Sequence, residues 1–320
     1  MQRVLLFMSL FLITRIASAD VTILRVMMDA EAEMRPSITN VNRISTMNIS
    51  VYIRANVTGS ASQPGNVTMS ASAVERTGGH IHVNPPPPTG TFNPNNGKME
   101  LIHRYDSGRA YYSFSTEYTA PDNAGRFKLT ASAGGKSVIR TLEIKIPGLV
   151  ALSPLTTQTY RRVGQTNQHP NNFYAIPDVI TALENAARQW RTYWNGLPDT
   201  ERARYDSEVG RLQINDCSLQ WGGVFDVDLT ITPQFWSPPH STHRVGLDTD
   251  IRLDRAETDG GIPEDSQIPG DRKKYENEFY EILRNVYAGA TARPHGTGLN
   301  RHYHVYWVPN RDARRYSTYE

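Results

Sequence analysis

The chain has 320 residues, of which 38% are hydrophobic and 21% are charged, and its formal net charge is +2. These values are typical of a globular protein long enough for two domains, and they exclude a largely disordered chain. Basic and acidic residues are interspersed along the sequence, so we expect no nucleic-acid partner.

The N-terminus has the pattern of an export signal. Arg3 supplies a positive charge, residues 4–13 form an apolar run, and Ala17-Ser18-Ala19 offers small residues at the cleavage positions. We therefore expect residues 1–19 to be a signal peptide removed before Asp20, which predicts a periplasmic, cell-surface or secreted protein. The apolar run is too short to cross the roughly 30 Å hydrocarbon core of a membrane, so no transmembrane segment is expected after cleavage.

Residues 20–147 are expected to form an all-β domain. Apolar and polar residues alternate over 47–54, 110–116 and 126–132, which predicts strands. Turn-forming residues separate these strands, and short strands with such turns favour a sandwich. The segment 117–131 resembles the last hairpin of bacterial immunoglobulin-like domains, so the expected fold here is an immunoglobulin-like sandwich. A strand over 138–146 would close the domain before a linker at Pro147-Gly148.

Residues 149–310 are expected to form a second domain of α+β class with an antiparallel sheet, followed by a C-terminal tail at 311–320. The apolar stripe after Pro177 predicts a helix that stops near Gly196. The other predicted elements are helices over 199–209 and 272–288, and strands over 211–217, 224–232, 248–253 and 301–308.

Two histidine-containing segments of this region are candidates for a metal site. Alternate side chains of an extended strand share a face, so His302 and His304 should point the same way, as should Asp248 and Asp250. Burying such side chains without partners costs several kcal/mol. Two imidazoles and one carboxylate with an open fourth position suit catalytic zinc. The alternative is a set of surface histidines on a half-exposed sheet.

At these residues the chain resembles the zinc peptidases related to D-alanyl-D-alanine carboxypeptidases and the hedgehog fold, and among them the penicillin-insensitive murein endopeptidases. His243, Gly246 and Asp250 match the His-Xaa-Xaa-Gly-Xaa-Xaa-Xaa-Asp motif of that branch. His302 and His304 match its later His-Xaa-His motif. The resemblance covers residues 210–308 or so and implies a hedgehog-type α+β fold for the second domain.

The resemblance also implies roles for individual residues. Zn2+ would be held by His243, Asp250 and His304, and His302 would be the nearby general base or a transition-state partner. His240 or His295 would stabilise the oxyanion. The implied substrate is a murein peptide. Leu299 stands where that branch has a further histidine, and His295 is the candidate that could replace it.

Several other side chains have more than one interpretation. The lone cysteine, Cys217, is expected to be a small buried hydrophobe rather than a nucleophile. Asp248 is either a partner that orients a metal ligand or a solvated carboxylate. Arg244 and Arg252 either bind a substrate carboxylate or are surface charges. A second His-Xaa-His at His80 and His82 is expected to be a polar edge or a contact surface for the other domain rather than a second metal site.

Three functions stay open from the sequence. The first is a murein endopeptidase or carboxypeptidase whose β-domain is a wall-targeting or spacing module. The second is a zinc peptidase that acts on ordinary secreted proteins. The third is a non-enzymatic surface protein that uses the β-domain for adhesion and a degenerate zinc site for structure. The bond cleaved, the ligand of the β-domain and the oligomeric state are left open as well.

Overall fold

A computed structural model describes residues 20–37, 44–59, 65–74, 76–79, 86–153, 159–164, 171–205, 207–224, 227–228, 235–236, 243–253, 271–295 and 302–307. The expected signal peptide and C-terminal tail lie outside these residues. Among the described residues, no helix combines the length and the apolar character needed to span a membrane.

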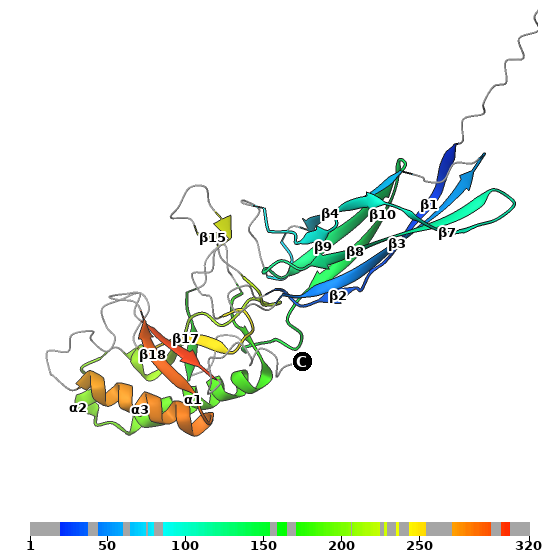
Figure 1. Ribbon diagram of the computed structural model, residues 1–320. Coiled ribbons are helices and arrows are strands. Elements are labelled where there is room, and N and C mark those ends of the chain that lie inside the picture. The colour runs from blue at the N-terminus through cyan, green and yellow to red at the C-terminus, as the bar shows by residue number, and fades with distance from the viewer. Residues whose placement is uncertain are drawn as a thin grey trace, which may run out of the picture.

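The first ten strands form two sheets that share one core, and together we call them the sheet pair. One sheet has the order β1-β3-β8-β5 with β7 also paired to β8, and the other has the order β2-β10-β9-β4-β6. These strands lie together at one end of the molecule (Figure 1). Their bounds are β1 Val21–Asp29, β2 Glu33–Met34, β3 Thr46–Val57, β4 Asn66–Val74, β5 Thr91–Asn93, β6 Asn96–Lys98, β7 Glu100–Arg104, β8 Arg109–Thr119, β9 Gly125–Ala133 and β10 Lys136–Ile144.

The long strands of the sheet pair follow from their alternating sequence. In β3 every second residue from Met47 to Val57 is buried, and the residues between them face solvent or are half-buried. The same alternation holds in β8 and β9, so each sheet turns one apolar face toward the other. The side chains from both sheets pack in a single core between residues 23 and 144.

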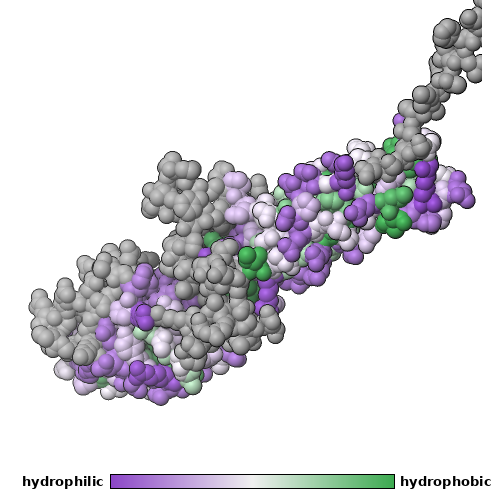
Figure 2. All heavy atoms as spheres, viewed as in Figure 1, coloured by the Kyte–Doolittle hydropathy of each residue, from purple (hydrophilic) through white to green (hydrophobic). Residues whose placement is uncertain are grey.

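The surface of the sheet pair carries a few apolar side chains. Figure 2 shows a mostly hydrophilic face with isolated hydrophobic spots. Leu101 and Ile102 on β7 are 51% and 54% exposed. Scattered apolar residues of this kind are normal on a protein surface.

Residues after 149 build a second core from helices and a five-stranded sheet, whose order is β12-β14-β17-β19-β18. Two short strand pairs, β11 with β13 and β15 with β16, complete the region. The strand bounds are β11 Val150–Ala151, β12 Tyr160–Arg162, β13 Tyr174–Ala175, β14 Leu212–Ile214, β15 Val227–Asp228, β16 Phe235–Trp236, β17 Asp248–Arg252, β18 Thr291–His295 and β19 His302–Tyr306. The helices are α1 Pro177–Gly196, α2 Asp199–Arg202 and α3 Asp271–Val286, with a 3-10 turn at Ser207–Gly210.

Helices α1 and α3 cover the apolar face of the five-stranded sheet. Pro177 opens α1, where its missing N–H costs no helical hydrogen bond. The buried side chains of α1 recur at intervals of three and four residues from Val179 to Trp194. Trp190 packs against Phe279 of α3 at 6.2 Å between ring centroids, and Phe279 packs against Tyr303 of β19 at 5.3 Å. This contact chain joins both helices to the sheet.

The predicted fold class is wrong. We expected an immunoglobulin-like sandwich followed by a hedgehog-type α+β domain with an antiparallel sheet. Of the residues that the structure describes, 47% are in strands and 18% in helices, and the strands form several sheets, so the fold is mostly β. The five-stranded sheet is mixed, because β12 runs parallel to β14. Long helices have a periodicity that is easy to recognise, whereas strands of two or three residues are too short to show alternation, so the short strands of the second region were not predicted.

Individual elements agree better than the fold class. The helix predicted from Pro177 to Gly196 is confirmed as α1, and the predicted strands over 248–253 and 301–308 are confirmed as β17 and β19. The domain boundaries at 20–147 and 149–310 stay predictions.

Candidate metal centre

The candidate site lies on the face of the five-stranded sheet that is turned away from the helices. Strands β17 and β19 pair antiparallel, and Asp250 and His304 are direct Cα partners. His302 and Tyr306 share the face of His304, as the alternation predicts. Tyr303, Val305 and Trp307 lie on the other face, in the core with α1 and α3. The polar face is therefore held in place by a packed apolar one.

His243 reaches the sheet from the loop before β17. Its Nδ1 atom lies 2.8 Å from the carbonyl oxygen of Cys217, which fixes the ring orientation and leaves Nε2 directed at Asp250. Gly246 turns this loop with φ of 71°, and an added Cβ there would lie 2.6 Å from Leu149 and 2.7 Å from the backbone of Ala175. A glycine at this position therefore lets the loop approach Leu149 and Ala175 closely.

The three predicted ligands meet in the folded chain. Their candidate ligand atoms all lie within 4.8 Å of one another. Oδ1 of Asp250 lies 3.4 Å from Nε2 of His243 and 2.9 Å from Nδ1 of His304. The side chains of His243 and Asp250 are fully buried, and that of His304 is 12% exposed. The cluster is thus largely enclosed, and His304 is its most exposed member.

This donor set fits zinc. In a tetrahedral zinc site with nitrogen and oxygen ligands, neighbouring ligand atoms are about 3.3–3.5 Å apart. The separations of 2.9 and 3.4 Å measured from Asp250 are close to that value. Three protein ligands, two of them imidazoles, are the usual composition of a catalytic rather than a structural zinc site.

The charges within the cluster perturb its titration in the metal-free chain. Burial would lower the pKa of His243, but the charge and hydrogen bond of Asp250 outweigh it and raise the pKa to about 9. Burial would raise the pKa of Asp250, but the positive charge of His243 and bonds from both imidazoles lower it well below its usual range. Burial, together with the charge of His243, lowers the pKa of His304. Near neutral pH the metal-free cluster therefore contains an ionised Asp250 and a protonated His243.

His302 and His295 form a second tier beside the cluster. Nε2 of His302 lies 3.3 Å from Oδ2 of Asp250 and 3.2 Å from Nδ1 of His295. His302 is buried, whereas His295, on the neighbouring strand β18, is exposed. The predicted base and one predicted oxyanion partner are therefore next to the cluster. The other residues singled out, His240, Leu299, His80 and His82, lie outside the described residues.

The remaining candidates near the site have defined positions. Asp248 is 4% exposed, so it is not a solvated carboxylate. Arg244 is 3% exposed and its guanidinium is paired with Asp122 at 3.4 Å, which removes it from the set of substrate-binding surface arginines. Arg252 is half-buried on β17. Cys217 is fully buried, and burial raises the pKa of its thiol well above the ordinary value, as expected for an inert core cysteine.

Two further residues lie next to the site, and the sequence reasoning assigned a role to neither of them. The ring of Tyr306 packs on that of His304 with centroids 4.5 Å apart, and the alternation that placed His302 and His304 on one face could have found it. Asp216 follows β14, and its carbonyl oxygen accepts a hydrogen bond of 2.7 Å from the N–H of Asp250 on β17. This bond extends the pairing of β14 with β17 and brings Asp216 next to the site. Its carboxylate accepts a hydrogen bond from Asn172.

No family model matches the chain, and a search of curated proteins finds no match either.

Proposed function

We propose that this chain is a zinc-dependent peptidase that hydrolyses peptide bonds in the stems or cross-links of murein. The observation that carries the proposal is the convergence of His243, Asp250 and His304 from separate segments within 4.8 Å. The motif spacing around these residues, which resembles that of murein endopeptidases, supports murein peptides as the substrate class.

The residues around the cluster suit hydrolysis by an activated water. When bound, zinc would act as a Lewis acid that polarises a carbonyl group and lowers the pKa of water to about 7. His302 is placed to accept the proton at Nε2, where the carboxylate of Asp250 stabilises the resulting positive charge. His295 lies 3.2 Å from that atom and is exposed, so it offers the proton a path to solvent or to the leaving amine.

Two features favour catalysis over a purely structural zinc site. Within the part of the chain that the structure describes, the cluster offers three candidate ligands, whereas a structural site is normally closed by four. Beside these ligands, Nε2 of His302 lies 3.3 Å from Oδ2 of Asp250, so an ionisable group that could act as a base borders the cluster. A non-enzymatic surface protein would have no need of a base at that position.

Metal analysis and digestion of two substrates test the proposal. The purified full chain should contain about one zinc per molecule and release peptides from murein, and His304→Ala should lose both properties. The matched control is His103→Ala, because His103 lies on β7 of the sheet pair and is exposed. If the chain binds zinc and cleaves an unfolded protein substrate but not murein, ordinary proteins would replace murein peptides as the substrate class. Zinc binding without hydrolysis of either would overturn the enzymatic assignment.

A further inference from the structure

We propose that Asp122, in the turn between β8 and β9, is a positioning residue for the metal centre. Its carboxylate holds Arg244, the residue that follows the predicted ligand His243, and the sheet pair thereby keeps His243 in place. The inference rests on the proposed function, since it assigns a second part of the chain to the same zinc site.

The backbone contacts at this junction join three segments. Asn123 and Gly223 form an isolated antiparallel bridge, and the N–H of Val224 donates to the carbonyl of Asp122 at 3.0 Å. On its other side, the N–H of Gly223 donates to the carbonyl of Arg244 at 2.8 Å. Gly223 is therefore held between the turn of the sheet pair and the loop that carries His243.

This packing depends on two glycines. A Cβ added to Gly223 would lie 2.6 Å from the backbone nitrogen of Ala124, and one added to Gly222 would lie 2.5 Å from the carbonyl oxygen of Arg244. Both glycines have positive φ angles, of 74° at Gly222 and 73° at Gly223. No larger side chain fits there without moving backbone on either side.

A charge pair between the buried Arg244 and the partly exposed Asp122 completes the contact. The guanidinium of Arg244 lies 3.4 Å from Oδ2 of Asp122, and Arg244 is only 3% exposed. A charge taken out of water needs an opposite charge and hydrogen bonds to be tolerated. Asp122 supplies the opposite charge across 122 residues of sequence.

The segment that holds Arg244 is fixed to the sheet pair at a second point, Trp221. Its N–H donates to the carbonyl of Gly78 at 3.1 Å, and its carbonyl accepts a hydrogen bond of 2.8 Å from Ile146. The cations of Arg126 and Lys145 lie 5.5 and 5.9 Å from its ring centroid.

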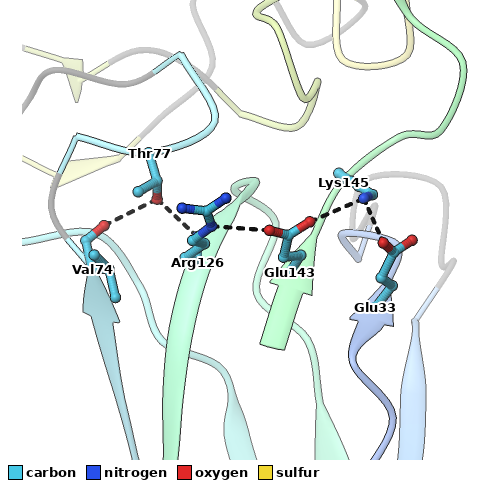
Figure 3. Close-up of polar contacts among 6 residues, drawn as sticks. All are labelled: Glu33, Val74, Thr77, Arg126, Glu143 and Lys145. Carbon is cyan, nitrogen blue, oxygen red and sulfur yellow. Dashed lines mark hydrogen bonds and ion pairs between the residues drawn. The ribbon is translucent and has the colours of Figure 1, made fainter. Parts of the chain in front are cut away.

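Those two cations are themselves held in a row of side chains. Figure 3 shows Glu143 between Arg126 and Lys145, with Glu33 beyond Lys145. Glu143 accepts from Arg126 at 2.9 Å and from Lys145 at 3.0 Å, and Glu33 accepts from Lys145 at 2.6 Å. The row connects side chains of β9, β10 and β2 with Lys145. The two cations that contact the ring of Trp221 are therefore themselves held by ion pairs.

The same segment also orients the ligand. Cys217, whose carbonyl oxygen lies 2.8 Å from Nδ1 of His243, is four residues before Trp221. His243 is thus held from both sides by chain that rests on the sheet pair, through Cys217 and through Arg244. The sheet pair serves as part of the support of the metal centre, beyond the targeting or spacing role expected from the sequence.

The test compares zinc affinity and the visible spectrum of the Co2+-substituted full chain. Asp122→Asn removes the charge but leaves every backbone contact, and we expect it to weaken zinc binding about tenfold and to alter the Co2+ absorption bands. Asp122→Glu keeps the carboxylate and should recover most of the affinity. Glu281→Gln, which removes an exposed ion-pair partner on α3, is the matched control and should change neither. Arg244→Lys tests the same contact from the other side if Asp122→Asn does not fold.

The outcomes separate this inference from the proposed function. Asp122→Asn with a lower unfolding midpoint but wild-type zinc affinity and Co2+ spectrum would mean a structural role only, and would overturn the positioning role. The zinc site itself would then still stand, provided that His304→Ala loses the metal. A wild-type chain that binds no zinc would overturn both.

Discussion

Asp250 and His304 face each other directly across β17 and β19, and Nδ1 of His304 lies 2.9 Å from Oδ1 of Asp250. His243 and His302 approach the same carboxylate at 3.4 and 3.3 Å. A single buried carboxylate therefore has three imidazoles around it, and its removal should affect the metal site and the metal-free fold together.

Asp250→Asn should abolish zinc binding and destabilise the metal-free chain by about 3 kcal/mol at pH 7, because the protonated His243 loses its buried counter-charge. Zinc titration and denaturant unfolding measure the two effects. Asp199→Asn, at a 90% exposed carboxylate on α2, should leave both unchanged. Normal zinc affinity in Asp250→Asn would exclude Asp250 as a ligand.

The stability of the metal-free chain should fall with rising pH above 6.5. The folded pKa of His243, about 9, exceeds the value of about 6.5 in an unfolded chain, so its contribution is complete below pH 6.5 and is lost as the pH rises through 9. Between pH 6.5 and 8.5 the loss should be about 2 kcal/mol. His304, whose pKa is lowered, is neutral in the folded chain over this range, and the unfolded chain loses its remaining proton there just above pH 6.5, an opposing gain of only about 0.4 kcal/mol.

Zinc should reverse that trend, because the metal competes with the proton for His243. Unfolding curves of metal-free and zinc-loaded protein at several pH values provide the comparison. Equal pH slopes in the two forms would contradict the assignment of His243 as a ligand.

Gly246→Ala should destabilise the chain by more than 2 kcal/mol and weaken zinc binding, because the new Cβ would meet backbone at 2.7 Å. Gly148→Ala is a well-matched control. Its φ is 78°, close to the 71° of Gly246, but an added Cβ has no neighbour within 4 Å. Gly148→Ala should lower the free energy of unfolding by only about 1 kcal/mol, because alanine is strained in the left-handed backbone conformation. Similar losses in both variants would show that steric contact at Gly246 is unimportant.

Tyr306→Ala should weaken zinc binding about tenfold, since the ring packs on the predicted ligand His304 at 4.5 Å between centroids. Tyr306→Phe keeps the ring and should stay close to wild type. If Tyr306→Phe lost murein hydrolysis while retaining zinc, the hydroxyl group would instead be placed in the reaction.

The sequence was informative where periodicity was long and unbroken. Alternation over β3, β8 and β9 predicted these strands, and the apolar stripe after Pro177 predicted α1 with its correct end at Gly196. The strands β11 to β16 have two or three residues each and show no usable period. The edge strand β18 was missed because Pro294 and charged neighbours mask it. These short elements made the predicted fold class wrong.

The candidate site was predictable in part, for a different reason. The grouping of His243, Asp250 and His304 follows from residue chemistry and strand alternation, which are local properties. The pairing of Asp122 with Arg244 joins residues 122 positions apart, and no local pattern marks it. Burial of Asp248 likewise depends on what packs over β17, which periodicity alone does not reveal.

Trp221 gives the junction an intrinsic optical signal. Five tryptophans occur in the chain, and this one is half-buried, with two cations near its ring and with its backbone N–H and carbonyl bonded to Gly78 and Ile146. Indole emission responds to nearby charge and to water. Loosening of the sheet pair from the metal loop would therefore be visible as a change in fluorescence, without any label, before either core unfolds.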